Sequence, residues 1–184
     1  MRTVTVDFEP FQGTGSPTLY ARVGANILFA GAAVVSFFTS TLGDPFAHFD
    51  SQPRWIFMTF SSFAVAAFNI TAATAVWARF RKIADSDAEP GHEYSRYSQL
   101  KTLFVLSTIL GAVLAGATAF LASLWKTATD ENSGFIAPCL CGIFAFIIDI
   151  VAMVGDSLLF LQERKAFIQA TSSEAELGEG EIII

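Results

Sequence analysis

The amino-acid sequence predicts an all-α integral membrane protein, a four-helix antiparallel bundle with both termini on the cytoplasmic side. Three observations lead to this prediction. Of the 184 residues, 53% are hydrophobic and 15% are charged, and the mean hydropathy is +0.51, which is more apolar than a soluble domain tolerates on its surface. Four long apolar stretches follow one another along the chain, and the basic residues gather in every second segment between them.

Each apolar stretch has the roughly 20 residues that a helix needs to cross a bilayer. Lipid offers the backbone no hydrogen-bond partners, so a helix is the expected conformation. Short loops join the stretches, and consecutive helices are therefore expected to pack antiparallel. The predicted membrane domain, 20–162, lies between a cytoplasmic N-terminal segment at 1–19 and an acidic cytoplasmic tail at 163–184. The four predicted helices cover residues 20–42, 55–80, 103–125 and 135–161.

The first two helices carry isolated polar residues among apolar ones. The 20–42 segment has Arg22 and Asn26 near its start. The 55–80 segment has an amide, Asn69, on a face of otherwise small residues at helical spacing. Such residues are expected to face a neighbouring helix rather than lipid, because an unpaired polar group is costly in hydrocarbon.

Small residues also mark one face of each of the last two helices. Helices in membranes associate through small residues that let two backbones approach closely, so both faces are expected to turn inward. In the 103–125 segment this face includes Gly111 and Ala115. In the 135–161 segment, alternating spacings of three and four residues place two aspartates on the face. Its members are Gly142, Ala145, Asp149, Ala152 and Asp156.

The two aspartates need a reason, because an ionised carboxylate at mid-bilayer costs at least ~2.5–3.5 kcal/mol. Counting residues from the predicted helix ends puts Asn69 level with Asp149 and puts no Lys or Arg at that depth. We therefore expect a neutral Asp149 that shares a hydrogen bond with Asn69. Asp156 is expected nearer the cytoplasm, within reach of Asn26 or Arg22. Three roles stay open: a structural clamp between helices, a proton or cation site, and a charge that pairs with a partner protein's helix.

The basic residues set the predicted orientation. Nine of the 11 lie on one side of the predicted helices, and the side richer in Lys and Arg is normally cytoplasmic. Three tryptophans lie near predicted helix ends and are expected in the headgroup region: Trp55, Trp77 and Trp125. The nine basic residues are Arg2, Arg22, Arg79, Arg81, Lys82, Arg96, Lys101, Arg164 and Lys165.

No sequence pattern points to an enzyme, a cofactor or a metal. A nucleophile–base pair, a phosphate-binding glycine loop and a haem signature are all absent from the sequence. His48 and His92 are predicted on opposite sides of the membrane, which disfavours a haem site. Cys139 and Cys141 are expected to be plain thiols. No basic patch interleaved with aromatic residues points to nucleic acid.

The second half of the chain resembles the MARVEL-domain tetraspan proteins, which include the synaptophysins and synaptogyrins. The resemblance lies in AFLASLWKTATDENSG, followed by IDIVAMVGDSLLFLQERKAF. In that family an aromatic residue closes the third helix and a short outer loop follows. The fourth helix then carries Gly and polar residues before a charged cytoplasmic exit. Gly155, Asp156 and Phe160 stand in the corresponding places. The resemblance implies a non-enzymatic role in membrane organisation, vesicle traffic or junctions.

The leading interpretation is a non-enzymatic scaffold or organiser that acts through lateral helix packing, in a plasma or vesicle membrane or in an organelle membrane. Its expected partners are membrane lipids, other membrane proteins and further copies of itself. One alternative is an accessory subunit of an ion channel, transporter or energy-converting complex. A weaker one is a proton or cation pathway through Asp149 and Asp156. Ile182 and Ile184 before the terminal carboxylate form a candidate hook for a PDZ-type groove.

Overall fold

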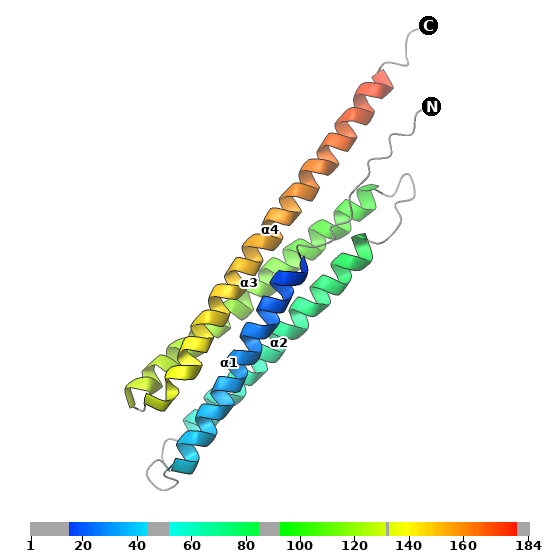
Figure 1. Ribbon diagram of the computed structural model, residues 1–184. Helices are drawn as coiled ribbons and strands as arrows, with labels where there is room; N and C mark the ends of the chain where they lie inside the picture. The colour runs from blue at the N-terminus through cyan, green and yellow to red at the C-terminus, as the bar shows by residue number, and fades with distance from the viewer. Residues whose placement is uncertain (1–14, 44–51, 85–92, 132, 180–184) are drawn as a thin grey trace.

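The computed structural model describes residues 15–43, 52–84, 93–131 and 133–179, and these form an all-helical bundle (Figure 1). Four long helices are joined in chain order, with one short 3-10 turn between the last two. The elements are α1 (Gly15–Gly43), α2 (Gln52–Ala84), α3 (Glu93–Glu131), η1 (Ser133–Phe135) and α4 (Ile136–Glu179).

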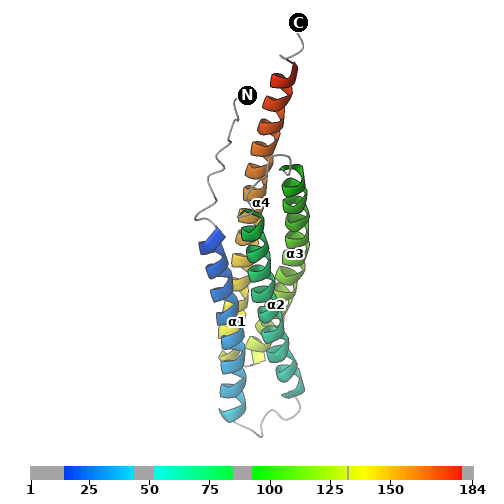
Figure 2. The same ribbon diagram turned by 90° about the vertical axis from the view of Figure 1, so that its right-hand side faces the viewer.

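The helices run alternately up and down, and their neighbours form a closed ring. Helix α1 packs against α2 and α4, and α3 packs against the same two helices. The start of α1, the end of α2, the start of α3 and the end of α4 lie toward one end of the bundle (Figures 1 and 2). We call this the α2–α3 end and call the opposite one the η1 end. The predicted four-helix bundle is therefore confirmed.

Facing residues recur at equal intervals on antiparallel neighbours. Arg22 contacts Asp149, and Phe29 lies against Gly142, so seven residues separate the two contacts on both α1 and α4. Between α2 and α3, Ser62 bonds to Trp125 and Asn69 bonds to Thr118, again seven residues apart on both helices. A seven-residue interval is two helical turns, which keeps one face of each helix against its neighbour.

All four predicted segments are helical, and the helices extend beyond them except at the start of the last, where Phe135 belongs to η1. The stretches long and apolar enough to cross a membrane are Thr18–Thr39, Pro53–Ile83, Tyr97–Thr129 and Ser133–Gln169. Helix α4 continues to Glu179, so most of the predicted tail at 163–184 is helical. The division into N-terminal segment, membrane domain and tail stays a prediction. Ile182, Ile184, His48 and His92 lie outside the described residues.

The outer surface of the bundle is apolar. Large hydrophobic side chains are exposed on all four helices, among them Val35, Phe60, Val113 and Phe144. Hydroxyl groups on this surface are bonded within their own helix, as where Thr71 Oγ1 donates to the Ala67 carbonyl at 2.8 Å. Such back-bonding satisfies a hydroxyl without water, so the surface suits a hydrocarbon environment.

The η1 end of the interior is aromatic. The rings of Trp55 and Trp125 both pack on Phe135, with centroid distances of 4.6 and 5.3 Å. The headgroup prediction for these two tryptophans is wrong, because both are buried inside the protein. Their indoles close the bundle instead of anchoring it in the interface. Trp77 is half-buried, with the Arg81 guanidinium 4.9 Å from its ring centroid.

Stacked rings join α3 and α4 toward the α2–α3 end. Phe104 stacks on Phe160 with centroids 4.4 Å apart, and Tyr97 stacks on Phe167 at 4.5 Å. Each pair is seven residues from the other on both helices. The two helices therefore keep their alignment toward the start of α3, beyond which α4 continues alone (Figure 2).

Candidate functional site

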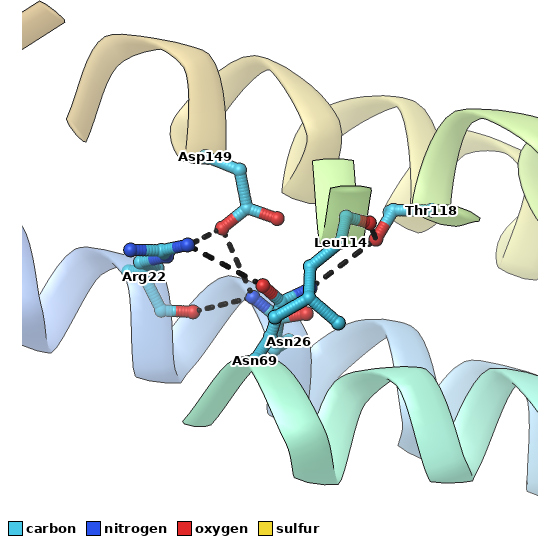
Figure 3. A network of polar contacts seen from close by, with 6 residues as sticks. All are labelled: Arg22, Asn26, Asn69, Leu114, Thr118 and Asp149. Atoms are coloured by element: carbon cyan, nitrogen blue, oxygen red, sulfur yellow. Dashed lines mark hydrogen bonds and ion pairs between the residues drawn. The ribbon is translucent and has the colours of Figure 1, made fainter. Parts of the chain in front are cut away.

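A layer of polar side chains crosses the middle of the bundle, and every helix contributes to it (Figure 3). Helix α1 supplies a cation and an amide, α2 an amide, α3 a hydroxyl and α4 a carboxylate. We call this set the polar layer. It consists of Arg22, Asn26, Asn69, Thr118 and Asp149, of which four are fully buried and Arg22 is nearly so.

An ion pair forms the centre of the polar layer. Arg22 Nε donates to Asp149 Oδ1 at 2.9 Å, and the two side chains are 10% and 0% exposed. Because a guanidinium keeps its charge in proteins, Asp149 faces a permanent cation. An ionised carboxylate inside a membrane bundle needs such a partner, because an isolated charge there has a high free-energy cost. Asp149 is therefore held inside the bundle by a residue 127 positions earlier in the chain.

One chain of hydrogen bonds in the polar layer leads from the Arg22 guanidinium to α2 and α3. Arg22 Nη2 donates to Asn69 Oδ1 at 3.4 Å, a long bond, and Asn69 Nδ2 donates to Thr118 Oγ1 at 3.3 Å. The Thr118 hydroxyl in turn donates a hydrogen bond to the Leu114 carbonyl at 3.0 Å. Since arginine is only a donor, it fixes which way both Asn69 and Thr118 point. The chain thus links α1, α2 and α3.

Asn26 supports the same ion pair from α1. Its Nδ2 donates to the Arg22 carbonyl at 3.0 Å and to Asp149 Oδ1 at 3.5 Å. Both partners are acceptors, so the amide cannot be turned around without placing oxygen against oxygen. Asp149 Oδ1 therefore receives two donors, both from α1.

Small residues make room for the polar layer. A Cβ on Gly111 would lie 3.2 Å from Met153 and 3.7 Å from Arg22 Nη2. On α4, Ala145 and Ala152 flank Asp149 and are buried. One turn beyond Ala145, a Cβ on Gly142 would lie 2.9 Å from Phe29 and 3.0 Å from the Ala122 Cβ. Of the predicted small-residue faces, Gly111 and Ala115 on α3 and Gly142, Ala145 and Ala152 on α4 are buried in the bundle.

The structure brings together Arg22, Asn26, Asn69 and Asp149, all four named from the sequence. Their pairing differs from the prediction. The expected Asn69–Asp149 hydrogen bond is wrong, because Arg22 stands between the two side chains and binds both. The prediction that no Lys or Arg lies level with Asp149 is also wrong, because Arg22 contacts it. The alignment of α1 with α4 places Arg22 level with Asp149, deeper than its position near the predicted start of the first span suggested.

Asp156 does not join the polar layer. It lies two turns from Asp149 on α4, toward the α2–α3 end, and is half-buried. Arg22 is close enough to act on it electrostatically, yet the Arg22 guanidinium donates to Asp149 and Asn69 instead. The expected partner is thus nearby but bound to the other aspartate.

Sequence reasoning missed Thr118. A usable signal existed, because Gly111, Ala115, Thr118 and Ala122 follow spacings of four, three and four residues along α3. Thr118 is the one member of that face with a hydrogen-bonding side chain. A small inward face that contains a hydroxyl is therefore worth examining as a whole.

A second polar contact lies nearer the η1 end. Trp125 Nε1 donates to Ser62 Oγ at 3.0 Å, and Ser62 donates to the Met58 carbonyl at 2.8 Å. The buried indole is thus satisfied by a neighbouring helix, as a buried Trp usually is. This contact belongs to the packing of α2 against α3 and holds no charge.

Neither the polar layer nor the cysteines make a metal centre. Within the described ranges, no group of three His, Cys, Asp or Glu residues is arranged to hold an ion. Cys139 and Cys141 are free thiols near the start of α4, the first buried and the second half-buried. The polar layer can pair charges and direct hydrogen bonds, and both abilities serve helix association.

These features define a class: a multi-pass integral membrane protein whose four helices are tied together by an internal polar layer. No protein-family model, no curated protein and no solved structure matches this chain.

Proposed function

We propose that the protein is a non-enzymatic tetraspan organiser, which acts in the membrane by packing its outer helix faces against other membrane proteins or further copies of itself. One observation carries the proposal. Each side chain of the polar layer is buried and makes at least one bond to another residue of the chain, whereas the outer face is apolar and contains glycines in open space. A surface of this kind suits lateral contact with lipids and helices.

Two exposed glycines offer places for such contact. A Cβ on Gly31 or on Gly116 would meet no atom within 4 Å. Gly31 lies between the exposed Leu28 and Val35 on α1, and Gly116 lies on α3 near the exposed Val113. Each is a shallow site between large apolar side chains, where another helix can approach closely.

The proposed orientation keeps both termini cytoplasmic. Arg22 is removed from the count of interfacial charges, because it lies inside the bundle. The remaining described basic residues still favour the α2–α3 end as the cytoplasmic side. Those toward this end are Arg79, Arg81, Lys82, Lys101, Arg164 and Lys165. The resemblance of the second half to MARVEL-domain proteins supports the organiser role and a plasma or vesicle membrane.

An accessory subunit of a larger membrane complex is the second candidate. The observation that favours it is the length of α4, which has 44 residues and continues past the start of α3 (Figure 2). A projecting helix provides a binding surface for a partner outside the membrane. A proton or cation pathway is the weaker candidate, because Asp149 is already paired with Arg22.

The test is purification from the native membrane in mild detergent, followed by native mass measurement and identification of the proteins that co-migrate. Homo-oligomers or defined membrane partners are expected for an organiser. A stoichiometric channel, transporter or redox complex would replace this proposal with the accessory-subunit role. A monomer that carries only lipid, in several detergents and in nanodiscs, would argue against both.

A matched pair of variants locates the contact. Gly31→Leu fills an open site on α1 and is expected to weaken association without lowering stability. Ala64→Leu adds similar bulk at an exposed position of α2, about level with Gly31 by the facing contacts, and should leave association unchanged. Equal association of the two variants and the native chain would exclude the Gly31 face.

A further inference from the structure

Two buried oxygen atoms of the polar layer receive no hydrogen bond from the protein. They are Asn26 Oδ1 and Asp149 Oδ2, and both side chains are fully buried. Figure 3 shows the second oxygen of Asp149 pointing away from Arg22, whose donors go to Asp149 Oδ1 and to Asn69. A buried acceptor without a donor is rare in native proteins and calls for an explanation.

The hydrogen-bond donors of Asn26 and Thr118 are already committed. The Asn26 amide is fixed because its NH₂ group faces the Arg22 carbonyl and Asp149 Oδ1, both of which only accept. The Thr118 hydroxyl hydrogen is committed to the Leu114 carbonyl. Both orphan atoms thus belong to groups whose other atoms are engaged.

The two orphan atoms belong to neighbouring side chains. Asn26 Nδ2 lies 3.5 Å from Asp149 Oδ1, and each orphan oxygen shares a planar group with one of these atoms. Two unpaired acceptors on neighbouring groups favour a compact ligand with two donors. Arg22 already balances the charge of Asp149, so a second cation there would be repelled.

We propose that a water molecule binds between α1 and α4 and donates one hydrogen to Asn26 Oδ1 and the other to Asp149 Oδ2. Water is neutral, has two donors, and typically occupies buried polar sites where protein donors are missing. It would complete the hydrogen bonding of the ion pair. This site is independent of the proposed organiser function.

We expect water to enter this site from the α2–α3 end. Arg22 is 10% exposed, and the half-buried Asp156 lies two turns beyond it on that side. Toward the η1 end, Phe29 and Phe135 are fully buried and close the interior. Exchange is therefore expected from one side of the membrane.

The test is solid-state NMR of the full chain in lipid bilayers, with ¹³C-labelled Asp and Asn. The measurement is the transfer of water-proton magnetisation to side-chain carbonyl carbons at short mixing times. The chain contains an internal control, because Asn69 is as buried as Asn26 but both its polar atoms are bonded to protein. Several-fold faster transfer to Asn26 and Asp149 than to Asn69 is expected.

A variant sharpens the measurement. Asn26→Leu removes one acceptor and should slow transfer to Asp149 several-fold, whereas Thr118→Val, which lies at the far end of the hydrogen-bond chain, should leave it unchanged. Equal transfer to Asn26 and Asn69 in the native protein would overturn the proposal. So would an Asp149 carbon shift typical of a protonated acid, because Asp149 would then donate to Asn26 directly. The native comparison stands even if Asn26→Leu fails to fold.

Discussion

The interior of the bundle contains two regions that hold the same helices together by different means. Toward the η1 end, Phe29, Trp55, Trp125 and Phe135 form a fully buried aromatic core. Two turns from Phe29 on α1, Arg22 belongs to the polar layer, where an ion pair is linked to two amides and a hydroxyl. The aromatic core depends on the close fit of its side chains, and the polar layer depends on the pairing of charges and hydrogen-bonding groups.

The difference has a physical reason. Lipid tails are as apolar as the aromatic core, so burial against another helix gains little hydrophobic free energy there. Close packing between the helices is then the main source of stabilisation, as where Phe29 lies against Gly142. The polar layer behaves differently, because each of its members would be unpaired if its helix faced lipid. We infer that the polar layer selects which helices associate and that the aromatic core determines how closely they do so.

Arg22→Leu gives the strongest test of the polar layer. It leaves Asp149 buried without its cation, and the expected loss in unfolding free energy is about 3–5 kcal/mol. Reversible unfolding in bicelles with increasing SDS measures this loss. Arg79→Leu, at an exposed position on α2, is the matched control and should shift stability by at most about 0.5 kcal/mol.

A second substitution shows whether the loss comes from the unpaired carboxylate. The double variant Arg22→Leu with Asp149→Leu removes both charges and should regain much of the stability. If the double variant is as unstable as Arg22→Leu alone, the ion pair is not the source of the effect.

Gly142→Ala tests the close fit beside the aromatic core. The added methyl would lie 2.9 Å from Phe29 and 3.0 Å from the Ala122 Cβ, so α4 must move away. The expected loss is about 1–3 kcal/mol, by the same unfolding measurement. Gly31→Ala is the control. Its methyl enters open space, and the substitution also replaces a glycine inside a helix. Rescue of Gly142→Ala by Phe29→Leu is expected, and its failure would locate the strain elsewhere.

Trp125→Phe separates the hydrogen bond of the aromatic core from its packing. The ring stays but the N–H that donates to Ser62 is lost, at a cost of about 1 kcal/mol for the bond. A double-mutant cycle with Ser62→Ala isolates the pair, since the coupling free energy excludes the change in ring size. A coupling close to zero would mean that shape alone holds this region.

Thr118→Val probes the end of the hydrogen-bond chain and has the smallest expected effect. Loss of the acceptor for Asn69 should cost about 0.6 kcal/mol, the average for polar contacts between membrane helices. Thr71→Val is the control on the lipid-facing surface, where the hydroxyl bonds only to its own helix. Its unfolding free energy should match that of the native chain, and an equal loss in both variants would remove any special role for the polar layer.

The helices could be predicted from sequence because hydropathy and length are strong signals in membrane proteins. Their ends were less accessible. The charged stretch after Leu161 keeps a helical conformation through Glu179, well beyond the predicted end of the last segment. Composition reports where a chain leaves the hydrocarbon, and that point need not be where its helix ends.

The members of the polar layer were predictable, but their partners were not. A polar residue in an apolar helix is conspicuous, so Asn26, Asn69 and Asp149 stand out in the sequence. Pairing depends on how far each helix is shifted along its neighbour, and a count from predicted helix ends errs by several residues. That error placed Arg22 level with Asp156 rather than Asp149. The burial of Trp55 and Trp125 was missed because a tryptophan near a helix end has the same sequence signal inside or outside a bundle.

The seven-residue interval between Asp149 and Asp156 has a consequence for assembly. If α4 slid by two turns toward the η1 end, Asp156 would take the place of Asp149 opposite Arg22. Asp149 would then take the place of Gly142, between the apolar side chains of Phe29 and Ala122, where there is no space even for a Cβ. Helix α4 thus offers its arginine partner two candidate aspartates, and a glycine seven residues before the first one decides between them.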